Sequence, residues 1–217
     1  MYNFILFDLD GTLTDPKIGI TKSVQYALQK FDIEEPDLNN LTKFIGPPIF
    51  ASFKNFYHFN DTDAWKAVGY YRERFAEKGL FENTLLDGIH DLIKTLFAQG
   101  KVLYVATSKP TVFSKKIIQF FNLTEYFADV VGPDLQDKEA SKTRVIERIL
   151  EANSQKEKKD FVMIGDREHD IIGAKNCGID SIGVLFGYGS KEEIEHVHPT
   201  HIVSSVQDLQ ILLTRQI

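Results

Sequence analysis

Cysteine is almost absent from this sequence: Cys177 is the only one among 217 residues. A single cysteine excludes a disulfide bond within the chain and fits a reducing compartment. Cys177 lies on an apolar helical stretch that stops at Gly178, a pattern that favours core packing over a reactive thiol. We therefore expect a structural role for this side chain.

Long apolar segments and an excess of positive charge are also missing. No apolar run approaches the ~18 residues that a membrane-spanning helix needs. The first apolar run, residues 4–7, is interrupted at once by Asp8, so the N-terminus does not resemble a signal peptide. With Lys+Arg 25 against Asp+Glu 31, the net charge is −6, which argues against nucleic acid as a main partner. These absences predict a cytoplasmic protein with neither a membrane nor a nucleic acid as partner.

What the sequence does contain is an alternation of short apolar runs and helical patterns. Short runs that are mostly apolar and bounded by polar turns are typical of strands buried on both faces, and the stretches between them repeat apolar residues at helical spacing. Such alternation predicts an α/β fold with a doubly wound parallel sheet. The expected strands are residues 4–7, 102–106, 129–131, 161–164, 182–184 and 201–203.

One region interrupts this alternation. Residues 16–85 show helical periodicity and turn signals but no strand pattern. We interpret them as a small α-helical cap domain inserted into a core made of residues 1–15 plus 86–217. The polar stretch 195–199, near the other end of the chain, is expected to be a surface loop.

Reactive side chains follow three of the expected strands. Asp8 and Asp10 come directly after the first, Thr107 after the second along the chain, and Asp166 after residues 161–164, with Asp170 four positions later. Residues at i and i+2 of an extended chain face the same side. Because parallel strands end at one edge of the sheet, these side chains should meet there.

A pocket that gathers these carboxylates needs a cation, since close carboxylates repel one another and each is driven toward its neutral form. Oxygen-only ligands select a hard ion such as Mg²⁺, which also binds the oxygens of a phosphate. The sequence therefore predicts a magnesium site with an anionic substrate.

Several motifs resemble those of the haloacid dehalogenase (HAD) superfamily. DLDGTLTD at residues 8–15 looks like the first motif, VATSKP at 105–110 is similar to the second, and GDREHD at 165–170 resembles the fourth. The third motif is a lysine that opens a helix. Lys142 fits this position, although its neighbours are not the usual prolines, and Lys138 is the alternative.

The resemblance implies a phosphatase mechanism for these residues. Asp8 would be the nucleophile that forms an aspartyl phosphate, and Asp10 the general acid and base. Mg²⁺ would be held by the Asp8 side chain and the Asp10 backbone carbonyl, with Asp166 as a further ligand and Asp170 as its partner. The phosphate-binding residues implied in the same way are Thr107, Ser108 and Lys142.

The sequence resembles phosphoglycolate phosphatase-like members in particular, through FIGPP at 44–48 and GYG at 187–189, and the helical insert lies where their C1-type cap would. The expected substrate is a small phosphate ester, with phosphoglycolate as the first hypothesis. A 5′-nucleotidase that acts on nucleoside monophosphates and a β-phosphoglucomutase-like phosphomutase remain alternatives. A catalytically silent binding module is disfavoured by the intact set of acids. We expect a monomer or a weak homodimer.

Three further basic residues have weaker signals. Lys109 is expected to be a solvated side chain or an indirect helper of the site. Arg167 is expected to form an ion pair near the expected metal-binding loop at residues 165–170. Arg72, in the insert, is a candidate to pair with a substrate carboxylate.

Overall fold

Strand β1 (Phe4–Phe7) lies at the centre of the sheet in the computed structural model, which describes residues 2–137 and 141–214. It pairs in parallel with β4 on one side and with β6 on the other. Within the described residues the main sheet has six strands in the order β5-β4-β1-β6-β7-β8, all parallel. The predicted parallel α/β fold is confirmed. The other strands are β4 (Val102–Ala106), β5 (Phe127–Val131), β6 (Phe161–Gly165), β7 (Asp180–Val184) and β8 (His201–Val203).

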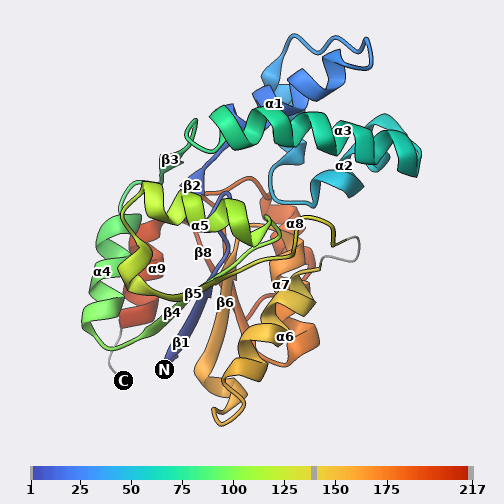
Figure 1. The fold of residues 1–217 in the computed structure, drawn as a ribbon. Coiled ribbons are helices and arrows are strands. Elements are labelled where there is room, and N and C mark those ends of the chain that lie inside the picture. Colours follow the sequence, from blue (N-terminus) through green and yellow to red (C-terminus); the bar gives the residue numbers. More distant parts are fainter. Residues whose placement is uncertain (1, 138–140, 215–217) are drawn as a thin grey trace.

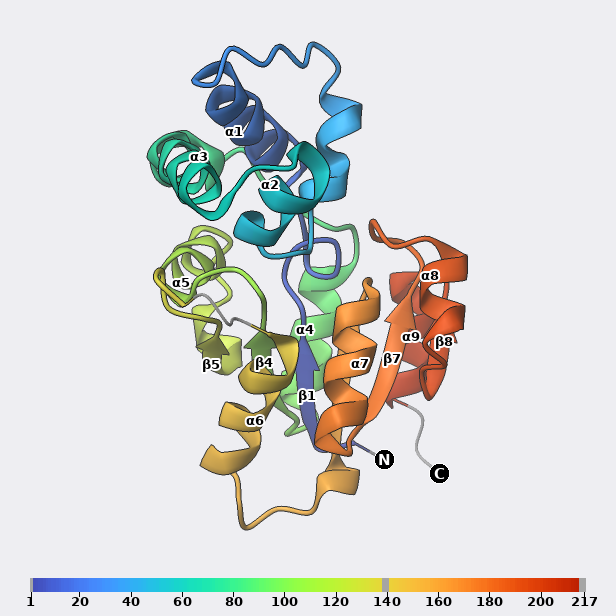
Figure 2. The same ribbon diagram turned by 90° about the vertical axis from the view of Figure 1, so that its right-hand side faces the viewer.

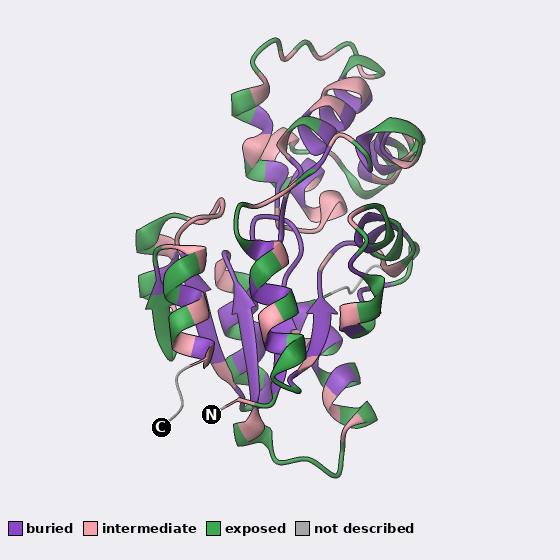
Figure 3. Ribbon diagram, turned by 90° about the vertical axis from the view of Figure 1, so that its left-hand side faces the viewer, coloured by how far each residue is buried: buried purple, intermediate pink, exposed green. Residues whose placement is uncertain are grey.

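Helices cover both faces of this sheet (Figures 1 and 2). Alternate residues of β1 face opposite layers: Ile5 and Phe7 join the core under one set of helices, and Phe4 and Leu6 the core under the other. The central strands β1 and β6 are therefore buried along their length, whereas the edge strands β5 and β8 are partly exposed (Figure 3). The first set of helices is α4 (Ile89–Ala98), α5 (Thr111–Phe120) and α9 (Val206–Thr214), and the second is α6 (Lys142–Ala152) and α7 (Glu168–Cys177).

The segment between residues 16 and 85 is helical and lies beyond the carboxyl ends of the strands (Figure 1). Its interior is rich in aromatic side chains, with Phe44 packed edge-on against Phe53 and Phe56. The division of the chain into a core and a cap stays a prediction. The segment contains α1 (Lys17–Gln29), a 3₁₀ helix (Leu38–Phe44), α2 (Ile49–Tyr57), α3 (Asp61–Arg74) and a π-helical turn (Phe75–Gly79).

Two short strands join this helical segment to the rest of the chain. β2 (Thr14–Asp15) pairs in antiparallel fashion with β3 (Thr84–Leu85), so the outgoing and returning connections run side by side. The sequence did not predict this pair, because two residues are too few to form a strand pattern.

A helix replaces part of the loop expected at residues 195–199. α8 (Lys191–His196) is capped at its N-terminus by Ser190, whose hydroxyl accepts a hydrogen bond from the Glu193 N–H. It packs through Ile194, which is fully buried and lies against Gly183 of β7. The expectation of a loop was wrong for its first two residues. Strand boundaries moved as well: β5 begins at Phe127 rather than at 129, β7 begins at Asp180 rather than at 182, and β6 ends at Gly165 rather than at 164.

We predict that Leu6→Ala destabilises the whole protein, because Leu6 is fully buried in the central strand. Removing a buried leucine costs about 2–5 kcal/mol of unfolding free energy. Urea denaturation followed by circular dichroism measures this loss. Ile211→Ala, at a side chain that is 44% exposed, is the control and should change stability by less than about 1 kcal/mol. Equal effects for the two variants would contradict the central place given to β1.

Candidate active site

Strand β1 delivers two carboxylates to the edge of the sheet that faces the helical segment. The Asp8 N–H donates to the Ile164 carbonyl at 2.8 Å, which continues the pairing with β6 past the last residue of β1. Asp8 and Asp10 are both buried, with 4% and 6% of their surface exposed. Gly11 then turns the chain with a φ of +88°, and a Cβ there would lie 2.3 Å from the Asp166 carboxylate. Only glycine allows this approach.

Asp8, Asp166 and Asp170 form a buried group whose carboxylate oxygens lie within 4.8 Å of one another. The Asp166 carboxylate accepts a hydrogen bond from the Tyr188 N–H at 2.7 Å and one from the Thr12 hydroxyl at 3.3 Å. Burial, with the charges of Asp8 and Asp170, nevertheless raises the pKa of Asp166 to about 8. Gathering these charges is therefore costly unless cations oppose them.

Lys142 supplies one such cation. It is the first residue of α6, directly after the N-cap Ser141, and its Nζ lies 2.7 Å from Asp8 Oδ1 and 2.7 Å from Asp170 Oδ1. The Ala106 carbonyl accepts a further hydrogen bond from it at 2.8 Å. Burial by itself would lower the pKa of Lys142, but the two carboxylates outweigh it and raise that pKa, so the group is an ammonium. Lys138, the alternative, lies outside the described residues.

Thr107 and Ser108 occupy the turn that follows β4. The Thr107 N–H donates to the Val131 carbonyl at 3.0 Å, and the Thr107 hydroxyl accepts from the Lys109 N–H at 3.2 Å. Thr107 is buried, whereas Ser108 is partly exposed and lines the pocket above the sheet edge. The structure thus brings both predicted phosphate-binding hydroxyls to the edge where Asp8 lies.

Lys109 was expected to be either a solvated side chain or an indirect helper of the site, and the structure excludes the first of these. It is not solvated: only 8% of it is exposed, and its Nζ lies 2.7 Å from Asp10 Oδ2. The sequence held no local signal for this, because Lys109 stands in a turn after β4, where the side-chain alternation of an extended strand does not apply. Burial raises the pKa of Asp10, and the Lys109 charge opposes that rise.

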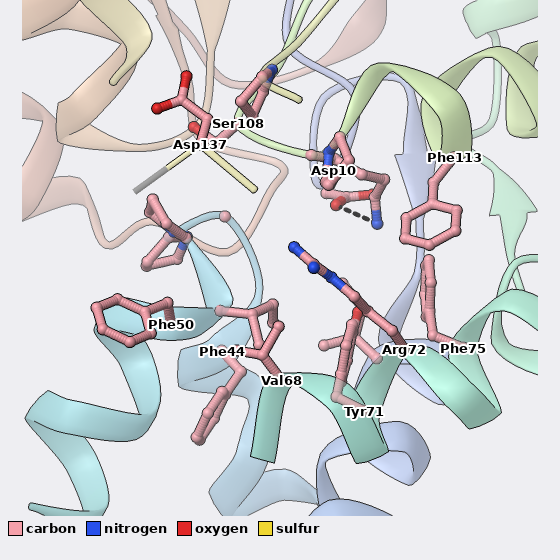
Figure 4. A pocket seen from close by; sticks show the side chains of 18 of the residues that line it. Asp10, Phe44, Phe50, Val68, Tyr71, Arg72, Phe75, Ser108, Phe113 and Asp137 are labelled. Carbon is pink, nitrogen blue, oxygen red and sulfur yellow. Dashed lines mark ion pairs between the residues drawn. The ribbon is translucent and has the colours of Figure 1, made fainter. Parts of the chain in front are cut away.

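A pocket opens between this edge of the sheet and the helical segment. Figure 4 shows the Arg72 side chain extending from α3 toward Asp10. No hydrogen bond or ion pair joins Arg72 to another described residue; its guanidinium lies 6.0 Å from the Trp65 ring centroid. Burial lowers the pKa of Arg72. The aromatic residues lining the pocket are Phe44, Phe50, Trp65, Tyr71, Phe75 and Phe113.

Two side chains connect the loops near Asp166 to the helical segment and to β2, the strand that leads into it. Arg167 forms an ion pair with Glu193 at 2.7 Å, as expected, and also donates to the Ile45 carbonyl of the segment at 2.7 Å. The Tyr188 hydroxyl donates to the Asp15 carboxylate in β2. The contacts of Arg167 with Ile45 and of Tyr188 with Asp15 were not predicted, because each joins residues far apart in sequence.

The acid group fits a hard divalent cation. Its donors are carboxylate oxygens only, they lie within 4.8 Å of one another, and they are buried, where excess negative charge is unfavourable. The Asp10 carboxylate is not part of this group, so Asp10 would contribute its backbone carbonyl, as the resemblance implies.

Comparison with known families agrees with this geometry. The family model described as haloacid dehalogenase-like hydrolase matches residues 5–184, from β1 to the end of β7. The chain belongs to this family. The prediction of an enzyme of HAD type is therefore confirmed. No helix among residues 2–137 and 141–214 combines the length and the apolar character required to cross a bilayer.

Relatives of this HAD-like hydrolase include proteins named 5′-nucleotidase, phosphoglycolate phosphatase and, at 33% identity, tyrosine-protein kinase PtkA. A 5′-nucleotidase of Pseudomonas aeruginosa is 44% identical over 98% of this chain and 96% of its own. A phosphoglycolate phosphatase of Vibrio parahaemolyticus is 25% identical over 94% of this chain and 93% of its own. The solved structure of a predicted phosphatase from Clostridium acetobutylicum is 48% identical, covers 98% of both chains and superposes with a TM-score of 0.95.

We predict that Lys142→Met strongly destabilises this HAD-like hydrolase, because it leaves the Asp8 and Asp170 carboxylates buried with no cation. Breaking a buried ion pair on one side costs about 3–5 kcal/mol of unfolding free energy. Denaturant titration measures the loss. The exposed lysine variant Lys94→Met is the control. Adding Asp170→Asn should recover part of the loss, and additivity of the two substitutions would contradict the coupling.

Proposed function

We propose that the protein is a Mg²⁺-dependent phosphomonoester hydrolase that forms a phosphoaspartate on Asp8. The observation that carries the proposal is the position of Asp8: its carboxylate is held by the Lys142 ammonium at 2.7 Å, and Asp10 stands two residues away at the same sheet edge. A carboxylate fixed in this way is a suitable nucleophile for phosphorus.

Each residue has one task in this mechanism. In the first step an Asp8 oxygen attacks phosphorus while the bond from phosphorus to the ester oxygen breaks, and Asp10 gives a proton to that oxygen. In the second step Asp10 takes a proton from the water that cleaves the phosphoaspartate. Lys142, with the hydroxyls of Thr107 and Ser108, would bind the phosphoryl oxygens.

The metal site proposed here consists of the carboxylates of Asp8 and Asp166 and the backbone carbonyl of Asp10. Asp170 lies next to these ligands and is paired with Lys142. When bound, Mg²⁺ would offset the negative charge of the phosphoryl oxygens. The raised pKa of Asp166, about 8, supports a cation here, because a cation would favour its charged form.

We propose nucleoside 5′-monophosphates as the substrate class. The pocket beside Asp10 is walled by aromatic side chains, which a two-carbon substrate such as phosphoglycolate would leave largely uncovered, whereas a nucleoside would contact them. Arg72 offers donors to the acceptor atoms of a base or sugar. The relative named 5′-nucleotidase, at 44% identity, supports the same choice. Phosphoglycolate stays the second candidate, because Arg72 has no ion-pair partner among the described residues and suits a carboxylate.

We predict that the purified protein hydrolyses phosphomonoesters only with Mg²⁺. EDTA should stop release of phosphate and added Mg²⁺ should restore it. Asp8→Asn should lower kcat by a factor on the order of 10³ or more, because an amide is a far poorer nucleophile. Asp87→Asn, at an exposed position, is the matched control and should keep full activity. Substantial turnover by Asp8→Asn would refute Asp8 as the nucleophile.

A substrate panel tests the substrate class. We expect kcat/KM for a nucleoside 5′-monophosphate to exceed that for phosphoglycolate and for ribose 5-phosphate by roughly tenfold or more, since burial of an apolar group of base size is worth more than 1.4 kcal/mol. Arg72→Met should lower that value by roughly tenfold, the effect of losing a charge-assisted hydrogen bond. Lys66→Met, on the exposed side of α3, is the control.

A different ranking would change the assignment. A preference for phosphoglycolate that Arg72→Met abolishes would favour the second candidate. Isomerised sugar with little free phosphate, from a hexose 1-phosphate and its bisphosphate, would favour the phosphomutase.

A further inference from the structure

Lys109 lies between the sheet edge and the helical segment and contacts both. Its Nζ is 2.7 Å from Asp10 Oδ2 on one side and 4.5 Å from the centroid of the Phe75 ring on the other. Phe75 belongs to the π-helical turn that follows α3. A single ammonium group thus connects the proposed general acid to the part of the chain that covers it.

The backbone of Lys109 is fixed where it leaves the sheet. Its N–H donates to the Thr107 hydroxyl at 3.2 Å, and its carbonyl accepts from the Ser114 hydroxyl at 3.3 Å. Gly132 packs so closely that a Cβ there would lie 2.2 Å from this carbonyl. The side chain therefore starts from a well-defined point, and its ammonium is held at the far end by Asp10.

The two oxygens of the Asp10 carboxylate have different surroundings. Oδ2 is paired with Lys109, whereas Oδ1 is buried and has no hydrogen-bond partner among the described residues. Asp10 also lines the pocket proposed to hold the substrate, and Figure 4 shows its ion pair with Lys109 as a dashed line at the pocket wall. Oδ1 is thus the oxygen left to exchange a proton with a bound molecule.

The Phe75 ring is itself held in place by both parts of the protein. It stacks on Tyr71 of α3 at 5.1 Å and meets Phe113 of α5 edge-on at 5.6 Å. Its exposed fraction is 1%. Attraction between an ammonium and an aromatic ring is strongest when both are shielded from water. The contact of Phe75 with Lys109 therefore depends on the helical segment lying against the sheet edge, as it does in this structure.

We propose that Lys109 is a positioning residue for Asp10 and that Phe75 makes this positioning depend on the seated helical segment. The proposal rests on the proposed function. Lys109 fixes Oδ2 so that Oδ1 faces the ester oxygen of the substrate. As the Asp8–phosphorus bond forms and the bond to the ester oxygen breaks, the proton on Oδ1 passes to that oxygen. The carboxylate that remains is stabilised by Lys109 and accepts a proton from water in the second step.

Dependence on the leaving group separates this role from direct binding of phosphate. Departure of p-nitrophenolate needs little help from an acid, whereas departure of phenolate needs more, and the two phosphate esters are nearly the same size. A residue that acts through the general acid therefore affects phenyl phosphate more than p-nitrophenyl phosphate. A residue that binds the phosphoryl group affects both equally.

The experiment measures kcat/KM for both esters with the full-length protein and Mg²⁺. In Lys109→Met we expect the value for phenyl phosphate to fall roughly ten to a hundred times more than the value for p-nitrophenyl phosphate, a part of the 10²–10⁴ that general acids contribute. Lys109→Arg should recover most of the difference. Phe75→Leu should show the same selectivity to a smaller degree. Lys116→Met, at an exposed site on α5, should leave the ratio unchanged.

The ratio of the two rates is internal to each preparation, so partial misfolding of a variant does not alter it. An equal loss on both esters, or no loss, in Lys109→Met would overturn the proposal. Asp10→Asn serves as the reference and should show the largest selectivity. If Asp10→Asn is selective and Lys109→Met is not, only the role of Lys109 is refuted. If Asp8→Asn remains active, the proposed function itself has failed.

Discussion

The Lys142 ammonium, buried between the carboxylates of Asp8 and Asp170, is the interaction on which the site depends. The three residues come from the end of β1 and the starts of α6 and α7. Negative charges cannot be brought together inside a protein unless positive charge is placed among them. The position of α6 against the sheet is therefore an electrostatic requirement of the site as well as a matter of apolar packing.

The same principle organises the other half of the pocket. Asp10 is paired with Lys109, just as Asp8 is paired with Lys142. Lys109 lies in the turn after β4, and Lys142 is the first residue of α6. Two carboxylates two residues apart thus have separate cations and different surroundings. In the proposed mechanism, this separation would let Asp8 act as the nucleophile and Asp10 exchange protons.

Much of this arrangement could be predicted from the sequence, because local patterns encode it. Buried strands show as apolar runs, and the parallel topology then brings Asp8, Thr107 and Asp166 to one edge. Contacts that join distant segments leave no such pattern. The approach of Phe75 to Lys109 and the bond from Arg167 to the Ile45 carbonyl depend on how the helical segment sits on the sheet. The pairing of β2 with β3 and the short helix α8 were missed because they are too brief to show a period.

The antiparallel pairing of Thr14 with Leu85 places the two ends of the helical segment next to each other. An insertion whose two ends are neighbours can be lengthened, shortened or exchanged without displacing the strands that flank it. The distance between its ends is fixed by the paired residues and does not depend on the length of the insertion. Grafting another segment between these two strands would therefore give the same reaction chemistry a different cover, and a short turn in their place would leave the carboxylates open to bulky molecules. Under the proposed function, reactivity and selectivity would thus lie on separable parts of one polypeptide.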